Sequence, residues 1–139
     1  MVEYGQRSIR GKTCHIKESN LGAGTPRCFC LYNYDIQAKP CAYVFIFEET
    51  KVVGDQTVEE ISRKGMNFSI TCQLWHIWTL DKERDKGYAS ALIDLLKTKY
   101  LKIVTQIETE EGKSLCLKNG FSMIPASSEN DVEWLVWEK

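Results

Sequence analysis

The sequence lacks an excess of basic residues and lacks any long apolar run. Its 139 residues include 18 Lys and Arg against 19 Asp and Glu, so the formal net charge is −1 at pH 7. A general nucleic-acid-binding surface needs a basic excess, and we therefore expect no nucleic-acid partner. No apolar run reaches the roughly 20 residues of a membrane span, and no signal peptide precedes the first polar residues. We expect a cytoplasmic protein with no membrane partner.

Repeats, linkers and low-complexity segments are also absent from the sequence. Hydrophobic residues make up 43% of the chain and charged residues 27%, which is typical of a soluble globular protein. A chain of 139 residues is long enough to bury a core of its own. We therefore expect a single domain spanning residues 1–139.

The six cysteines have no secretory signal beside them, so we expect free thiols rather than disulfides. Cys28 and Cys30, with Cys14, His15 and Cys41 nearby, suggest a zinc site as one interpretation. The C-x-C pattern lies in a strand-like run, where both side chains share one face of a sheet. Small apolar strand residues are the favoured interpretation, and we expect no metal.

Apolar and β-branched runs alternate with clusters of turn-forming residues along the chain. We expect strands at Ser8–Ile16, Arg27–Tyr34, Ala42–Glu48, Phe68–Leu80, Lys102–Ile107, Phe121–Ile124 and Glu133–Trp137. We expect helices at Val58–Lys64, at Gly87–Tyr100 and from Thr109 to Asn119-Gly120. The strand–helix–strand–helix order near the C-terminus requires a parallel strand pair, and short connections elsewhere imply antiparallel neighbours. The fold class is therefore a mixed α/β (α+β) domain.

The most informative segment is Leu80-Asp-Lys-Glu-Arg84-Asp-Lys-Gly87-Tyr-Ala89-Ser-Ala-Leu92. It places Arg-x-x-Gly-x-Ala between a strand and an amphipathic helix. Unpaired N–H groups and the positive end of the helix dipole coincide at such a point, which favours a phosphate. Gly87 has no Cβ, so a ligand can approach its main chain closely. The pattern is common before helices, and it needs a second signal to indicate function.

The second signal comes from the helix that begins at Thr109-Glu-Glu and ends at Gly120-Phe121 before the next strand. With the Arg84-x-x-Gly87-x-Ala89 turn, it makes the stretch from Phe68 to Lys139 resemble the GNAT superfamily of acyl-CoA-dependent N-acyltransferases. The turn is similar to the loop that holds the coenzyme A pyrophosphate in that family. The family usually has two helices between its first two strands, and no helix pattern precedes residue 57 here.

The resemblance implies a mixed, mostly antiparallel sheet flanked by helices, with a splayed central pair of parallel strands at Phe68–Leu80 and Lys102–Ile107. Main-chain groups freed by the splay would bond the pantetheine arm. Acetyl-CoA would be the co-substrate, with no metal. For the Arg84 and Lys86 side chains, a solvated turn is an equal alternative. The implied coenzyme A-binding residues are Leu80, Arg84, Asp85, Lys86, Gly87, Tyr88, Ala89 and Ser90.

The chemistry that the resemblance implies requires an amine to lose a proton, attack the thioester and release a protonated thiol. The family often places a tyrosine four residues before the Gly of Gly-Phe, and Cys116 stands there. A thiol can also supply a proton, although packing in the core is the alternative for Cys116. For the base, the resemblance points to the strand before the loop, which contains His76. A histidine titrates near neutral pH, although a structural histidine is the alternative.

We therefore expect transfer of an acetyl (acyl) group from coenzyme A to a primary amine by direct attack. The acceptor would be a small-molecule or protein amine, and a homodimer is one possible assembly. A catalytically silent acyl-CoA-binding or sensor module is the second hypothesis, because Cys116 replaces a tyrosine and Asp85 a glycine. A third hypothesis is an interaction protein that uses the fold as a scaffold and binds no coenzyme A.

Overall fold

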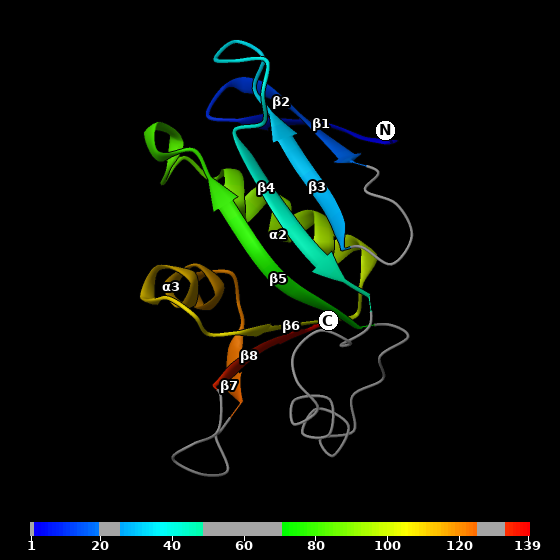
Figure 1. Cartoon of the computed structure of the whole chain (residues 1–139), viewed down its shortest axis with the longest axis vertical. Helices are drawn as coiled ribbons and strands as arrows, with labels where there is room; N and C mark the ends of the chain where they lie inside the picture. The colour runs from blue at the N-terminus through cyan, green and yellow to red at the C-terminus, as the bar shows by residue number, and fades with distance from the viewer. Residues whose placement is uncertain (1, 20–25, 49–70, 125–132) are drawn as a thin grey trace. The chain divides into compact units, whose positions relative to one another are not determined.

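The computed structural model describes residues 2–19, 26–48, 71–124 and 133–139 of the chain (Figure 1). The strands in these residues are β1 (Val2–Ile9), β2 (Lys12–Ser19), β3 (Arg27–Tyr32), β4 (Ala42–Phe47), β5 (Thr71–Thr79), β6 (Lys102–Gln106), β7 (Ser122–Ile124) and β8 (Trp134–Glu138). The helices there are α2 (Tyr88–Lys99), α3 (Glu110–Lys118) and a 3-10 turn, η2 (Asp81–Glu83). The helix expected at Val58–Lys64 lies outside the described residues.

The described strands are hydrogen-bonded in the order β1-β2-β3-β4-β5-β6-β8-β7. Strands β5 and β6 pair in parallel, whereas the β1–β2, β2–β3, β3–β4, β6–β8 and β7–β8 pairs are antiparallel. The prediction of a mixed, mostly antiparallel sheet with a parallel pair is therefore confirmed. Two compact units divide the chain, Met1–Ile46 with His76–Leu95, and Phe47–Trp75 with Leu96–Lys139. A single acyltransferase domain over residues 1–139 stays a prediction.

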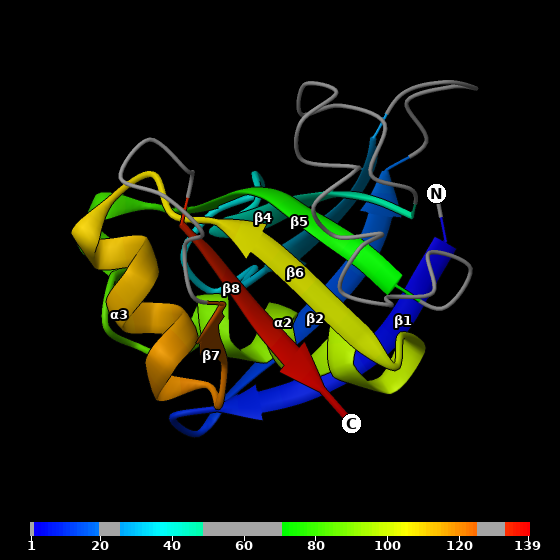
Figure 2. The same ribbon diagram turned by 90° about the horizontal axis from the view of Figure 1, so that it is seen from below.

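In the first unit, the pleat of strand β4 separates buried from half-buried side chains. Val44 and Ile46 are fully buried, whereas Tyr43 and Phe45 point to the other face and stay partly exposed. Helix α2 lies against one face of β3 and β4 (Figures 1 and 2), and its Leu92 is fully buried. The core of this unit therefore lies between the helix and the strands.

The first unit begins with a hairpin, which corrects the single strand predicted at Ser8–Ile16. Ile9 pairs with Lys12, so Arg10 and Gly11 form a two-residue turn with φ values of 51° and 78°. Positive φ at both central residues is the geometry of a type I′ hairpin turn. The usual sequence signals for that turn are Asn-Gly and Asp-Gly, and Arg-Gly does not resemble them. The prediction of a single strand was wrong because Arg10-Gly11 lacks the residue types by which a type I′ turn is predicted from sequence.

The six cysteines are all free and buried, as predicted. Cys28 and Cys30 share one face of β3, and their Sγ atoms lie 3.6 Å apart. Among the described residues, no group of three or more His, Cys, Asp or Glu side chains is placed to hold a metal ion. None of the described helices is both long and apolar enough to cross a membrane.

In the second unit, strand β6 lies between β5 and β8 (Figure 2). The parallel ladder runs from Thr71↔Lys102 to Leu74↔Thr105, and β5 continues beyond its last pair. The hydroxyl of Thr105 donates to the Leu74 carbonyl at 3.0 Å. Helix α3 ends at Lys118, and the predicted Asn119-Gly120 signal follows it, with Gly120 left-handed at a φ of 88°.

Candidate functional site

The chain leaves strand β5 at a point where its main chain is held firmly. The Leu80 N–H donates to the Cys41 carbonyl at 2.8 Å, and the Leu80 carbonyl accepts from the Glu83 N–H at 2.8 Å. This second bond closes the 3-10 turn that directs the chain toward α2. The predicted ligand residue Leu80 therefore already uses its N–H within the protein.

The loop between η2 and α2 alternates the sign of φ along its backbone. Asp85 has φ of 64° and Gly87 has φ of 90°, while Lys86 between them has no positive φ. Glycine takes a left-handed conformation without steric cost, and aspartate is one of the residues that tolerate it. Successive N–H groups in such alternating conformations can line a concavity that binds anions. The loop therefore has a backbone suited to a phosphate group.

Helix α2 starts directly at this loop. The Ala91 N–H donates to the Gly87 carbonyl at 3.0 Å, so the N–H groups of Tyr88 and Ala89, in the first turn, precede this i→i−4 bond. Every helix start leaves such N–H groups without an intrahelical acceptor. The first turn of α2 contains no acidic residue that would neutralise the helix dipole. The loop and the helix start therefore favour an anion at the same place.

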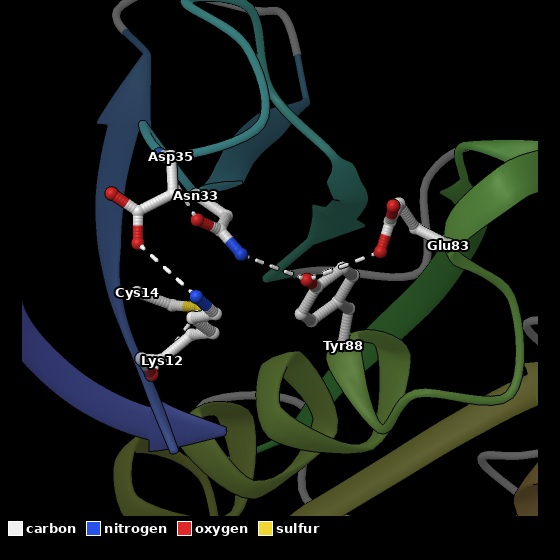
Figure 3. Close-up of polar contacts among 6 residues, drawn as sticks. All are labelled: Lys12, Cys14, Asn33, Asp35, Glu83 and Tyr88. Atoms are coloured by element: carbon white, nitrogen blue, oxygen red, sulfur yellow. Dashed lines mark hydrogen bonds and ion pairs between the residues drawn. The ribbon is translucent and has the colours of Figure 1, made fainter. Parts of the chain in front are cut away.

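A buried polar network fixes the first residue of α2 (Figure 3). The Asn33 side-chain amide donates to the Tyr88 hydroxyl at 3.0 Å, and this hydroxyl donates to a Glu83 carboxylate oxygen at 3.3 Å. Asn33 is 1% exposed and Tyr88 4% exposed, so water does not compete strongly for these bonds. Burial raises the pKa of Tyr88, which keeps the hydroxyl protonated as a donor. The network ties the helix start to the segment that follows β3.

The predicted cationic side chains of the loop each have an acidic partner. Arg84 lies 3.1 Å from Asp81 in an exposed pair, which contributes little to stability. The Lys86 ammonium lies 2.8 Å from the carboxylate of Glu83, whose side chain is only 8% exposed. Lys86 therefore balances a buried negative charge and remains half-exposed beside the loop. Arg84 is a solvated residue of the turn, and a ligand role for either cation stays a prediction.

His76, the predicted base, lies in the first unit on the exposed part of β5. Its ring faces Tyr43 and Phe45 of β4, with centroids 6.0 and 6.5 Å apart. Trp78, two residues further along β5, stacks on Tyr43 at 5.0 Å. His76 thus belongs to an aromatic surface on the strand face that carries Tyr43 and Phe45, and its catalytic role stays a prediction.

Cys116, the predicted proton donor, lies in the second unit on helix α3. Its side chain is 4% exposed, and this burial raises the pKa of the thiol to about 11. A thiol with this pKa is fully protonated at neutral pH. Its burial supports the packing interpretation as much as a catalytic one, so its role stays a prediction.

Sequence reasoning missed three residues that the structure places at the loop. Glu83 is a buried carboxylate in the turn, Asn33 holds the Tyr88 hydroxyl, and Arg10 of the hairpin donates to the Asp85 carbonyl at 2.9 Å. Glu83 stood inside the motif, but no pattern distinguishes it from its exposed acidic neighbours. Asn33 and Arg10 are 55 and 75 residues away from their partners, and local patterns carry no information at that range.

No protein-family model matches this sequence, and none of the curated proteins matches it. Solved structures do match its fold. The GNAT domain of S. lividans PAT aligns with a TM-score of 0.67 over 99% of this chain and 97% of that domain, with 10% identity. The Bacillus subtilis N-acetyltransferase YlbP, in complex with coenzyme A, aligns with a TM-score of 0.58 over 83% of this chain and 68% of its own, with 18% identity.

The fold is that of the GNAT acetyltransferases. An acetyltransferase from Thermus thermophilus has the same GNAT fold, with a TM-score of 0.59, 10% identity and 84% of this chain covered. This chain spans 66% of the length of that protein. The GNAT fold accounts for the parallel β5–β6 pair and for the strand, loop and helix that follow one another from β5 to α2. At these identities the likeness establishes the GNAT fold alone.

Proposed function

We propose that this protein is an acyl-CoA-dependent N-acyltransferase that transfers an acetyl group from coenzyme A to a primary amine. The observation that carries the proposal is the loop from Asp85 to Ala89, where two left-handed residues lead directly into a helix start without acids. Two solved proteins with this fold are described as complexes with coenzyme A, and both are N-acetyltransferases.

The residues present fit the coenzyme A diphosphate. Gly87 leaves the space of a Cβ open on the loop, and the nearest side-chain atom that a Cβ would meet is Ile9 Cγ2 at 3.9 Å. The N–H groups around Gly87 would donate to diphosphate oxygens, and Lys86 would add positive charge beside them. Asp85 is exposed, so its carboxylate can remain in water away from the anion.

The chemistry would be direct attack of the amine on the thioester carbonyl. The protein would hold the two reactants together, accept the proton of the amine and supply one to the leaving thiolate. His76 is the proposed acceptor, directly or through a water molecule. Cys116 is the proposed donor, since its raised pKa keeps the proton on sulfur at neutral pH. A small-molecule or protein amine is the proposed acceptor class; among the proteins of this fold, one is described in complex with an acetyl-methionyl-tRNA.

A silent acyl-CoA-binding module with the same fold is the second candidate. The observation that favours it is the burial of Cys116, which is 4% exposed at the position where the family often has a tyrosine. A buried cysteine that serves only packing would leave the leaving thiolate without this donor. In that case coenzyme A binding would persist without turnover.

Calorimetric titration with acetyl-CoA, followed by mass-spectrometric detection of acetylated products from an amine panel, tests the proposal. We expect binding and turnover in the wild-type protein. We expect His76→Gln to lose about 10²-fold in turnover with unchanged acetyl-CoA affinity, because glutamine cannot take the proton. Cys116→Ala should also lose turnover more than affinity. Binding without turnover would favour the silent module, and no binding would leave only a scaffold role.

A further inference from the structure

The tip of the N-terminal hairpin contacts the loop that precedes α2. Arg10 Nη2 donates to the main-chain carbonyl of Asp85 at 2.9 Å, across 75 positions of the sequence. The neighbouring Ile9 approaches the position that a Cβ on Gly87 would occupy. The hairpin and the loop both belong to the first compact unit. The loop backbone is therefore held from outside its own segment.

Turn chemistry alone does not explain an arginine at position 10. Its φ of 51° lies in the left-handed region, which asparagine, aspartate and glycine adopt more readily than arginine. Strained residues of this kind persist where the surrounding structure holds them. The bond to Asp85 is such a contact, and it engages one of the five N–H donors of the guanidinium.

The bond from Arg10 to the Asp85 carbonyl also fixes the direction of the Lys86 N–H. In a planar trans peptide the carbonyl of one residue and the N–H of the next point in opposite directions. Because Arg10 binds the Asp85 carbonyl, the Lys86 N–H points away from the guanidinium. Lys86 lies between the two left-handed residues of the loop, where an N–H pointing inward would face a bound anion.

We propose that Arg10 is a positioning residue for the diphosphate of coenzyme A, which orients the Asp85–Lys86 peptide so that the Lys86 N–H faces the anion. The inference rests on the proposed binding of coenzyme A at this loop. It assigns to the β1–β2 hairpin a role in ligand binding. It also gives a reason for the left-handed conformation of Asp85, whose carbonyl turns outward to the hairpin.

The test compares three hairpin variants in titrations with coenzyme A, dephospho-coenzyme A and acetyl-pantetheine. Arg10→Ala should lower the affinity for coenzyme A about tenfold, which is the effect expected for one charge-assisted hydrogen bond. Arg10→Gln keeps a neutral N–H donor and should lose clearly less. Lys12→Ala removes an exposed cation of the same hairpin that pairs with Asp35 at 4.0 Å, and should change the affinity less than twofold.

The three ligands separate positioning from other roles of the arginine. Positioning predicts the same loss for coenzyme A and dephospho-coenzyme A, and no loss for acetyl-pantetheine, which has no diphosphate. A loss confined to coenzyme A would overturn the inference, because it would assign Arg10 to the 3′-phosphate. Equal losses in Arg10→Ala and Lys12→Ala would also overturn it, because they would indicate a general field effect.

A measurement on the loop backbone distinguishes a local change at Lys86 from a general loss of folding. The amide resonance of Lys86, followed by NMR without ligand, should move in Arg10→Ala and stay in place in Lys12→Ala. Arg10→Gly, whose backbone adopts φ of 51° without strain, should repeat the affinity loss with an intact melting transition. Wild-type binding that Arg10→Ala leaves unchanged would overturn this inference alone. A wild-type protein that binds no coenzyme A would overturn the proposed function and this inference with it.

Discussion

Helices α2 and α3 begin in opposite ways, although each follows a strand by a short connection. At the start of α3, the Thr109 side chain accepts the Gly112 N–H at 3.0 Å, and Glu110 and Glu111 occupy the first turn. The residues at the start of that helix therefore cap one of its first N–H groups and compensate its dipole. The first turn of α2 contains no acid, and the chain before it takes positive φ at Asp85 and Gly87.

The difference indicates which helix start serves folding and which serves a ligand. Acids in the first turn stabilise a helix, but they also cancel much of the positive potential at its N-terminus that would attract an anion. A helix start without acids loses that local stabilisation and keeps its positive potential. At α2 the buried bonds of Tyr88 to Asn33 and Glu83 replace the missing local stabilisation. The predictions below test this division of roles.

The largest effect is expected at the loop glycine. Gly87→Val places a β-branched residue at φ of 90°, which costs of order 1–3 kcal/mol of backbone strain. We expect the loop to change shape and the affinity for coenzyme A to fall about 10- to 100-fold in a calorimetric titration. Gly120→Val is the matched control, with φ of 88° after α3 and similar space around it. The control should lose comparable stability and keep its affinity; equal affinity losses would refute the assignment.

The next effect concerns the network that holds the start of α2. Tyr88→Phe leaves the buried Asn33 amide without its acceptor and removes one donor from Glu83, so unfolding free energy should fall by about 1–3 kcal/mol. Chemical denaturation measures this loss. Tyr43→Phe is the control, because the Tyr43 hydroxyl has no hydrogen bond within the described residues. A loss equal to the control would show that the network does not stabilise the fold.

A smaller effect is expected at the cap of α3. Thr109→Ala removes the acceptor of the Gly112 N–H and should lower the unfolding free energy by about 1 kcal/mol. The affinity for coenzyme A should not change, because this helix start serves only its own helix. Thr109→Ser keeps the hydroxyl and should restore stability. A parallel loss of affinity in Thr109→Ala would contradict the separation of the two helix starts.

An acid in the first turn of α2, like those of α3, should raise the stability of the helix and lower the affinity for coenzyme A. Ala89→Asp places a carboxylate in the first turn of α2, which should stabilise the helix by about 0.3–1 kcal/mol. The same charge should repel the diphosphate and lower the affinity for coenzyme A about fivefold. Ala89→Asn has nearly the same shape without the charge and should show neither effect. An affinity that stays the same in Ala89→Asp would place the anion elsewhere.

At neutral pH the smallest effect is expected for Cys116, because its contribution to stability changes only at alkaline pH. Burial raises the pKa of its thiol from the ordinary 9.0 to about 11, so the folded state holds its proton over a range where the unfolded state loses it. The stabilisation is complete below pH 9 and is lost as pH rises through about 11. Denaturation curves between pH 8 and 11 should therefore show a steeper loss in wild type than in Cys116→Ala. The exposed Leu117, changed to alanine, should keep the wild-type slope; an unchanged slope in Cys116→Ala would show that the thiol is not perturbed.

Local patterns were sufficient for the elements of the second half of the chain. Helices α2 and α3 lie within one residue of their predicted bounds, because the periodicity of α2 and the capping signals of α3 act within a few residues. The same reasoning failed at the β1–β2 hairpin, where Arg10-Gly11 adopts a turn that its side chains do not favour. Arg10 takes a left-handed conformation that arginine does not favour locally, and in that conformation it binds the Asp85 carbonyl of the distant loop.

The sequence by itself determined the order of the elements from β5 onward and the motif at Arg84–Ala89, because periodicity, glycine placement and capping are local properties. It also indicated that Cys28 and Cys30 are small strand residues, because they lie in an apolar, strand-like run. Only the tertiary structure decided which side chains hold the loop. Asn33 and Arg10 come from segments remote from the loop, and their bonds to Tyr88 and Asp85 form only when the pairing of strands brings those segments to it. Glu83 lies only five residues before Tyr88, but its burial is also decided by the fold. A hydrogen bond requires its two atoms to lie about 3 Å apart, and a local sequence pattern does not encode the distance between remote segments.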